Sequence, residues 1–156
     1  YNQSNSIIMN WKITICLLIS LLAMESKAQN SEQENIKKLL EKESATYRSG
    51  DSKAHASCWH IQPYSRILVS TTDGNTYDVP PAEMVKVTED TTPRGGSSKN
   101  TNYKMSINGK TAWVSHNEES TAKDGTISYS YEIRLLEKIK KEWKLVGQSI
   151  HMYKKE

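Results

Sequence analysis

The chain has 156 residues, of which 36% are hydrophobic, and a formal net charge of +3 at pH 7. This size and composition are typical of one globular domain. The 21 basic and 18 acidic residues are too evenly balanced for a nucleic-acid-binding protein, which gathers positive charge on one face.

The first 28 residues have the three parts of a secretory signal peptide. Met9–Lys12 supplies the positive start, Ile13–Met24 is a short apolar run, and Ser26-Lys27-Ala28 matches a small-x-small cleavage site. The apolar run is shorter than the roughly 20 residues that a membrane-spanning helix needs. We therefore expect cleavage after Ala28.

Cleavage leaves one domain, residues 29–156, which we expect to be secreted or periplasmic and to lack a membrane segment; residues 1–8 have no assigned role. Of the two cysteines, only Cys58 then remains, so no internal disulfide can form. Its position beside Trp59 favours a buried small hydrophobic residue over a nucleophile.

The domain is predicted to begin with two helices. Ser31 and Glu34 form a capping box, and Gly50 is a typical helix terminator. Asp51 can cap a second, short helix that runs to about Trp59. Helical spacing places these residues on one face of the first helix: Ile36, Leu39, Leu40, Glu43 and Tyr47.

A change of pattern then predicts β-structure. Arg66–Thr72 and Thr76–Val79 flank an Asp-Gly turn and predict a hairpin. A Pro-Pro pair favours a third helix over Ala82–Thr88, and the Gly, Pro and Ser residues of Thr91–Asn100 predict a mobile loop. Short turns then join strands that should form an antiparallel meander: Asn102–Ile107, Lys110–Glu119, Thr126–Lys138 and Trp143–Tyr153.

Alternation in the strand Thr126–Lys138 separates an aromatic and aliphatic face from a polar one. The first carries Tyr129, Tyr131, Ile133 and Leu135, and the second carries Ser128, Ser130, Glu132 and Arg134. The strand Trp143–Tyr153 has bulky side chains on both faces, so both faces need cover. Helices can cover one face, and a partner subunit can cover part of the other.

This order of elements over residues 32–153 resembles the nuclear transport factor 2-like superfamily, which includes SnoaL-type polyketide cyclases and ketosteroid isomerases. Tyr47-Arg48-Ser49-Gly50-Asp51 is similar to the family's aromatic-x-x-Gly-Asp junction, and Glu142–Val146 is similar to the start of its last strand. The resemblance implies an α+β fold in which a cone-like, bent antiparallel β-sheet wraps around about three N-terminal helices. It also implies an apolar pocket at the open end of the cone and a homodimer formed through the sheet, but no single function.

Three residues are candidates for acid–base catalysis: His60, His116 and Glu118. His116 and Glu118 share one strand face, and a His–carboxylate pair can transfer protons, although a position near a turn also suits two solvent-exposed residues. His60 lies near the expected pocket mouth or on the surface. The four histidines lack the spacing of zinc ligands, so we expect no metal and no cofactor.

The aromatic residues predict a ligand pocket with a few hydroxyl groups. The chain has no Phe, so an ordinary core filled by Tyr and Trp is the alternative. The candidate pocket residues are Tyr47, Trp59, Tyr64, Tyr103, Trp113, Tyr129 and Tyr131.

Three functional hypotheses follow. The first is a secreted domain that binds a small apolar molecule or a partner, with no defined catalysis. The second is an isomerase-, cyclase- or dehydratase-like enzyme that uses acid–base chemistry on a small apolar substrate in the cone. The third is an oligomerisation module whose sheet is the functional surface.

Overall fold

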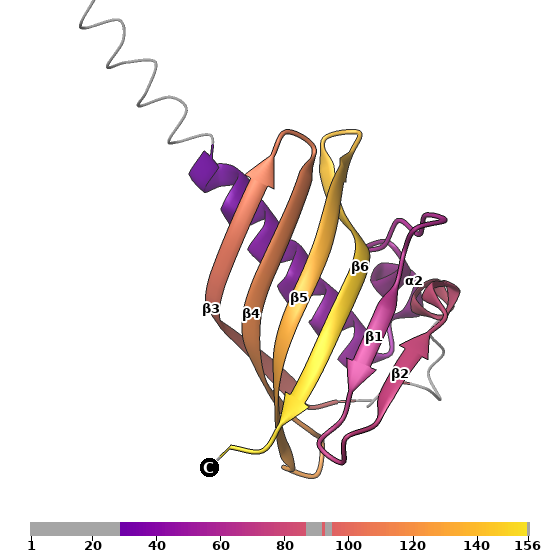
Figure 1. Cartoon of the computed structure of the whole chain (residues 1–156), viewed down its shortest axis with the longest axis vertical. Coiled ribbons are helices and arrows are strands. Elements are labelled where there is room, and N and C mark those ends of the chain that lie inside the picture. Colours follow the sequence, from indigo (N-terminus) through magenta and orange to yellow (C-terminus); the bar gives the residue numbers. More distant parts are fainter. Residues whose placement is uncertain (1–28, 87–91, 93–94, 156) are drawn as a thin grey trace, which may run out of the picture. The chain divides into compact units, whose positions relative to one another are not determined.

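The structure is a computed structural model in which residues 29–86, 92 and 95–155 are described (Figure 1). The predicted signal peptide lies outside the described residues, so its cleavage stays a prediction. Within the described residues, no helix has both the length and the apolar composition to cross a membrane.

The chain divides into two units, Tyr1–Ile36 and Lys37–Glu156. The described part of the first unit, residues 29–36, is helical. Since residues 29 and 30 already belong to the helix, Ser31 is not the N-cap that the capping-box pattern predicted. All features below belong to the second unit.

The second unit begins with a helix over residues 37–49. Gly50 follows it with φ of 75°, a left-handed conformation that favours glycine, so the predicted helix end is confirmed. The Asp51 side chain accepts a hydrogen bond of 3.0 Å from the Ala54 N–H and caps α2 (Ser52–Ala56). The cap was predicted correctly, but α2 ends before Trp59.

The predicted third helix is a single 3-10 segment, η1 (Pro81–Val85). The described residues therefore contain two stretches of α-helix and one 3-10 segment in place of about three α-helices. A segment of this length, started by proline, closes i→i+3 hydrogen bonds without extending into an α-helix.

The strands form one six-stranded mixed sheet in the order β2-β1-β6-β5-β4-β3. The predicted meander of the last four strands is confirmed, but β1 runs parallel to β6, so the sheet is not wholly antiparallel. The connection from β1 to β6 is long enough for a parallel pairing. The strands are β1 (Ile67–Ser70), β2 (Thr76–Val79), β3 (Ser97–Asn108), β4 (Thr111–Thr121), β5 (Ile127–Ile139) and β6 (Glu142–Tyr153).

The predicted loop Thr91–Asn100 is wrong at its C-terminal end, because β3 begins at Ser97 and pairs there with Thr121. Gly96 makes this start possible. Its φ is 84°, and a Cβ atom at this position would lie 2.1 Å from the Thr121 carbonyl oxygen. The pairing with β4 therefore extends a strand into a segment whose composition predicted a loop.

The helix over residues 37–49 crosses one face of the sheet, which we call the inner face (Figure 1). The opposite, outer face carries exposed apolar side chains, among them Trp113, Tyr131, Ile133 and Leu135. The buried apolar residues of the unit are Leu40, Cys58, Trp59, Ile67, Ala112, Val114, Leu136, Trp143, Leu145 and Val146.

A β-bulge in β6 decides which side chains face inward. Leu136 pairs with Leu145, but Leu135 pairs with Gly147, so Val146 is the extra residue of the bulge. The bulge reverses the alternation beyond it and places Leu145 and Gln148 on the same face. β6 carries bulk on both faces, as expected, but the distribution differs: Ile150 and Met152 share the inner face with Leu145, while His151 and Tyr153 occupy outer positions.

Candidate functional site

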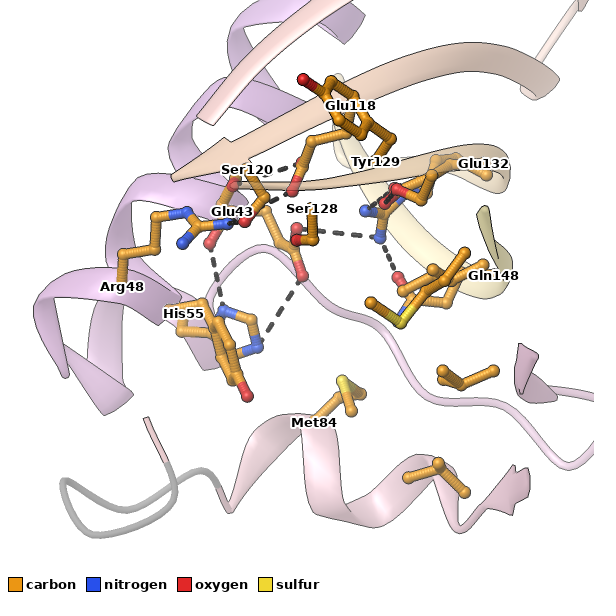
Figure 2. A pocket seen from close by; sticks show the side chains of 18 of the residues that line it. Glu43, Arg48, His55, Met84, Glu118, Ser120, Ser128, Tyr129, Glu132 and Gln148 are labelled. Atoms are coloured by element: carbon orange, nitrogen blue, oxygen red, sulfur yellow. Dashed lines mark hydrogen bonds and ion pairs between the residues drawn. The ribbon is translucent and has the colours of Figure 1, made fainter. Parts of the chain in front are cut away.

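A cavity of about 560 Å³ lies between the helix, η1 and the inner face of the sheet (Figure 2). One wall is apolar and the other is polar. Five side chains form the apolar wall: Val69, Val79, Met84, Ile150 and Met152. The polar wall comes from the helix, α2, β4, β5 and β6, and includes Glu43, Arg48, His55, Glu118, Ser120, Ser128, Ser130, Glu132, Arg134 and Gln148.

Arg134 is the centre of a buried network on β5. Its guanidinium donates to Glu132 and to the side chain of Gln148 on β6, and Nη1 lies 3.7 Å from Glu43 Oε2 on the helix. Ser130 Oγ donates to Glu132 Oε1 over 2.8 Å. Alternation along β5 aims these side chains to one side of the sheet, and the helix keeps water from them.

A second ion pair joins the helix to β4. Arg48 Nη2 lies 3.3 Å from Glu118 Oε1 and also donates to Ser120 Oγ. Ser44 Oγ lies 3.5 Å from Glu118 Oε2 and 2.7 Å from Ser98 Oγ on β3. Figure 2 shows Glu118 and Arg48 facing each other at one end of the cavity.

His55 on α2 lies against Glu43. Its Nδ1 is 3.3 Å from the Glu43 carbonyl oxygen, and its Nε2 is 3.9 Å from Glu43 Oε1. His55 is 1% exposed, and its Nε2 has no hydrogen-bond partner. An unpaired buried ring nitrogen costs free energy, and a hydrogen-bond donor placed against it would remove that cost.

The buried His116 and the partly buried Tyr103 form a separate pair beside the network. Their ring centroids are 5.3 Å apart, and His116 Nε2 lies 3.6 Å from Glu132 Oε2. Neither ring nitrogen of His116 has a hydrogen-bond partner, and neither does the Tyr103 hydroxyl. The register of β3 shifts between Thr101 and Lys104, so Tyr103 lies at a bulge in this edge strand.

Burial changes the pKa values of these groups in different directions. It raises the pKa of Glu118 to about 6, with added repulsion from Glu132, and the two arginines oppose this shift. It lowers the pKa of His116 to about 4, against the attraction of Glu132. Burial alone would raise the pKa of Glu132, but Arg134 and His116 hold it below its ordinary value.

Two of the predicted catalytic residues, His116 and Glu118, are buried on the inner face. Glu118 lines the cavity, whereas the His116 imidazole lies behind it against Tyr103. The alternative that both residues are solvent-exposed, which their position near a turn suggested, is therefore wrong, because the helix covers this end of β4. Their nearest charged partners are on other elements or strands: Arg48 for Glu118 and Glu132 for His116.

The third catalytic candidate, His60, and the neighbouring aromatic residues do not line the cavity. His60 donates its backbone N–H to the Leu145 carbonyl over 2.8 Å, and Trp59 is buried beside β6. Tyr64 is exposed and donates to Glu137. This segment is held to the start of β6 by backbone pairing, which directs it away from the cavity.

The other predicted aromatic residues are divided between the two faces. Tyr47 lines the cavity from the helix, and Tyr103 lies beside His116. Tyr129 also borders the cavity, although it shares the strand face of Tyr131 and its ring centroid lies 5.8 Å from that of Tyr153. Tyr131 and Trp113 are on the outer face, where Tyr131 is 53% exposed and stacks on Tyr153 with ring centroids 4.3 Å apart. The expected aromatic cavity is therefore not assembled, because strand alternation separates Tyr131 from the helix.

The sequence prediction missed most of the polar wall. Glu132 and Arg134 were assigned to the polar face of their strand, but that face is the inner one. The sequence could have indicated Glu43 as a site residue, because it occupies a position in the apolar stripe of the first helix, where an ionisable residue needs a buried partner. No pattern in the sequence indicates that the Gln148 side chain faces inward, because the bulge in β6 decides this.

The donors of the site do not form a metal centre. In the described part of the chain, no group of three or more His, Cys, Asp or Glu side chains is arranged to hold a metal ion. The charged groups instead pair with one another across the polar wall.

No protein-family model matches the sequence, and no curated protein matches it significantly. Solved structures do match. An NTF2-like protein with a cystatin-like fold from Novosphingobium aromaticivorans has a TM-score of 0.60 at 15% identity, with 83% of this chain and 87% of that chain covered. A protein of unknown function with a cystatin-like fold from Nostoc punctiforme has a TM-score of 0.59 at 14% identity, over 77% and 90% of the two chains.

A third match is a candidate Ca/calmodulin-dependent kinase II association domain from Exiguobacterium sibiricum, with a TM-score of 0.56 at 14% identity over 80% of this chain and 95% of that chain. At these identities the matches define the fold and leave the function open. The chain has the NTF2-like, cystatin-like α+β fold, and the resemblance predicted from the sequence is confirmed at this level.

Proposed function

We propose that the protein is a binding domain that takes up a small molecule with an apolar body and a polar group. The observation that carries this proposal is the cavity, in which an apolar wall faces a wall of buried charged and polar side chains. Cavities of about this volume are typical of small-molecule binding sites. The apolar wall would remove the ligand's body from water, and the polar wall would orient its polar group.

A thermal-shift screen of small amphipathic molecules tests this proposal, because a ligand that binds only the folded state raises the Tm. Ile150→Trp should fill the cavity and abolish the shifts that the hits produce. Ile127→Trp is the matched control, since Ile127 is exposed and does not line the cavity. Hits that persist in Ile150→Trp would contradict the proposed site.

A second candidate function is acid–base catalysis on a small substrate in the same cavity. It is favoured by Glu118, whose pKa is raised to about 6, close to the range in which a carboxyl group can both accept and donate a proton near neutral pH. Turnover of any hit from the screen, lost in Glu118→Gln while binding remains, would support catalysis. If the parent protein binds the hits without turning them over, catalysis is contradicted and the non-catalytic binding function is supported.

We also propose that two copies associate through the outer face. Its exposed apolar side chains favour an interface, and the Exiguobacterium protein described as an association domain has the same fold. Leu135, 47% exposed, lies in this patch. Sedimentation should show a dimer that Leu135→Lys converts to monomer while Lys104→Leu does not; a monomeric parent at all concentrations would contradict the proposal.

The signal-peptide pattern supports a secreted or periplasmic location for this binding domain. Mass spectrometry of the exported protein should find Gln29 as the first residue. Exported protein that still carries the sequence from Met9 onward would contradict cleavage.

A further inference from the structure

The charges of the cavity do not balance. Its polar wall contains three carboxylates, Glu43, Glu118 and Glu132, but two guanidiniums, Arg48 and Arg134. Both guanidiniums are already paired, Arg48 with Glu118 and Arg134 with Glu132, and Glu43 shares Arg134 with Glu132 at a longer distance of 3.7 Å. A ligand anion would have to displace a carboxylate from its guanidinium, whereas a ligand cation would compensate the additional carboxylate.

Two hydrogen-bond acceptors lie together at this carboxylate. A carbonyl oxygen only accepts, so the contact of His55 Nδ1 with the Glu43 carbonyl places the ring hydrogen on Nδ1. In the neutral imidazole, Nε2 is then an acceptor, and it is buried without a partner. It lies 3.9 Å from Glu43 Oε1, so one donor nitrogen at roughly 2.8–3.0 Å from each atom can bridge them.

From this arrangement, which rests on the proposed small-molecule function, we infer that the cavity binds primary amines with an apolar body and that the ammonium group lies between Glu43 and His55. Figure 2 shows the two side chains on the same side of the cavity, with Met84 across from them. Met84, Val79 and Ile150 would contact the apolar body.

An ammonium group fits this position better than a hydroxyl or a carboxylate. It has three donors and no acceptor, so it can bond to Glu43 and His55 together, and its charge compensates the unbalanced carboxylate. A hydroxyl has one donor and bonds to one of the two acceptors. A carboxylate brings only acceptors to a pair of acceptors.

Three probes with one aromatic skeleton separate these possibilities: 2-phenylethylamine, 2-phenylethanol and 3-phenylpropanoate. Calorimetry on the full chain near neutral pH and at physiological ionic strength should give a Kd for the amine that is at least about tenfold lower than that for the alcohol, with the acid weakest. Glu43→Gln should abolish the preference for the amine. Glu41→Gln, an identical change at an exposed position of the same helix, should leave it unchanged.

His55→Gln is the second variant, because it leaves both guanidinium pairs in place and stays informative where Glu43→Gln does not fold. In the parent protein, the ¹⁵N resonance of His55 Nε2 should shift on addition of the amine and not of the acid. A preference for the amine that survives both substitutions overturns the inference.

The controls also distinguish the inference from the function on which it rests. Equal or tighter binding of the alcohol or the acid, lost in Ile150→Trp, overturns the amine inference and leaves a small-molecule site. Absence of binding by all three probes, together with a screen without hits, overturns both.

Discussion

The two faces of the sheet have the reverse of the usual polarity in a soluble protein, because the face covered by the helix is polar at β5 and the exposed face is apolar. On β5, Glu132 and Arg134 are buried beneath the helix, while the neighbouring Ile133 and Leu135 are exposed. Charged side chains are tolerated in the interior of a protein only where each is paired with an opposite charge and hydrogen-bonded. The inner face therefore has the features of a site, and the outer face exposes an apolar patch.

Two tryptophans show the same difference between a buried and an exposed position on the sheet. Trp143 on the inner side is 5% exposed, whereas Trp113 on the outer face is 45% exposed. The same residue type thus lies in the core in one case and at the surface in the other.

Trp143→Ala should have the largest effect on folding, a loss of about 3–5 kcal/mol in the free energy of unfolding, because it leaves a cavity in the core. Trp113→Ala is the matched outer-face variant and should cost less than about 1 kcal/mol for the monomer. Urea unfolding measures both. Similar losses for the two tryptophans would show that the outer face is packed as tightly as the inner one.

Removal of a charge from the inner face should cost nearly as much. Arg134→Met leaves Glu132 and Glu43 buried without their guanidinium, and an uncompensated buried charge costs about 3–5 kcal/mol. The exposed pair Arg66–Asp78, with side chains 67% and 57% exposed, is the control. Arg66→Met should change the free energy of unfolding by about 0–1 kcal/mol. If Arg134→Met also lowers it by no more than about 1 kcal/mol, the charges around Arg134 do not form a buried network.

The pH dependence gives a smaller and more specific effect. His116 is faced by Glu132 and Arg134 from β5 and by the Tyr103 ring from β3, and its pKa is lowered from 6.5 to about 4. A lowered histidine pKa contributes stability above pH 6.5 that is lost as the pH falls toward 4. This should remove about 2 kcal/mol from the free energy of unfolding between pH 7.5 and pH 5.

His116→Gln should remove this part of the acid sensitivity, and His151→Gln, at an exposed position, should not. Glu118 acts in the opposite direction. Its pKa is raised from 4.5 to about 6, so its contribution is present below pH 4.5 and lost as the pH rises through 6. The acid loss in the parent should therefore be smaller than His116 alone gives, and Glu118→Gln should make it larger. Identical pH profiles for all variants would contradict the burial of both groups.

Local chemistry in the sequence determined the elements of the protein. Gly50 and Asp51 define the junction between the first two helices, the Asp-Gly turn defines the first hairpin, and alternation defines both faces of β5. These features depend on residues close in the chain, so the pattern alone predicts them, and their order was sufficient to indicate the NTF2-like fold.

The tertiary structure decided which face of the sheet is inside. Alternation separates Tyr131 from Glu132 but carries no information about which of them the helix covers, and apolar burial is the usual outcome. Here Glu43 and Arg48 on the helix are partners for Arg134 and Glu118, so the polar face can be buried. The bulge at Val146 then turns Gln148 and Ile150 into the same cavity. Such long-range pairing of charges and a one-residue shift in register depend on contacts that no local pattern in the sequence contains.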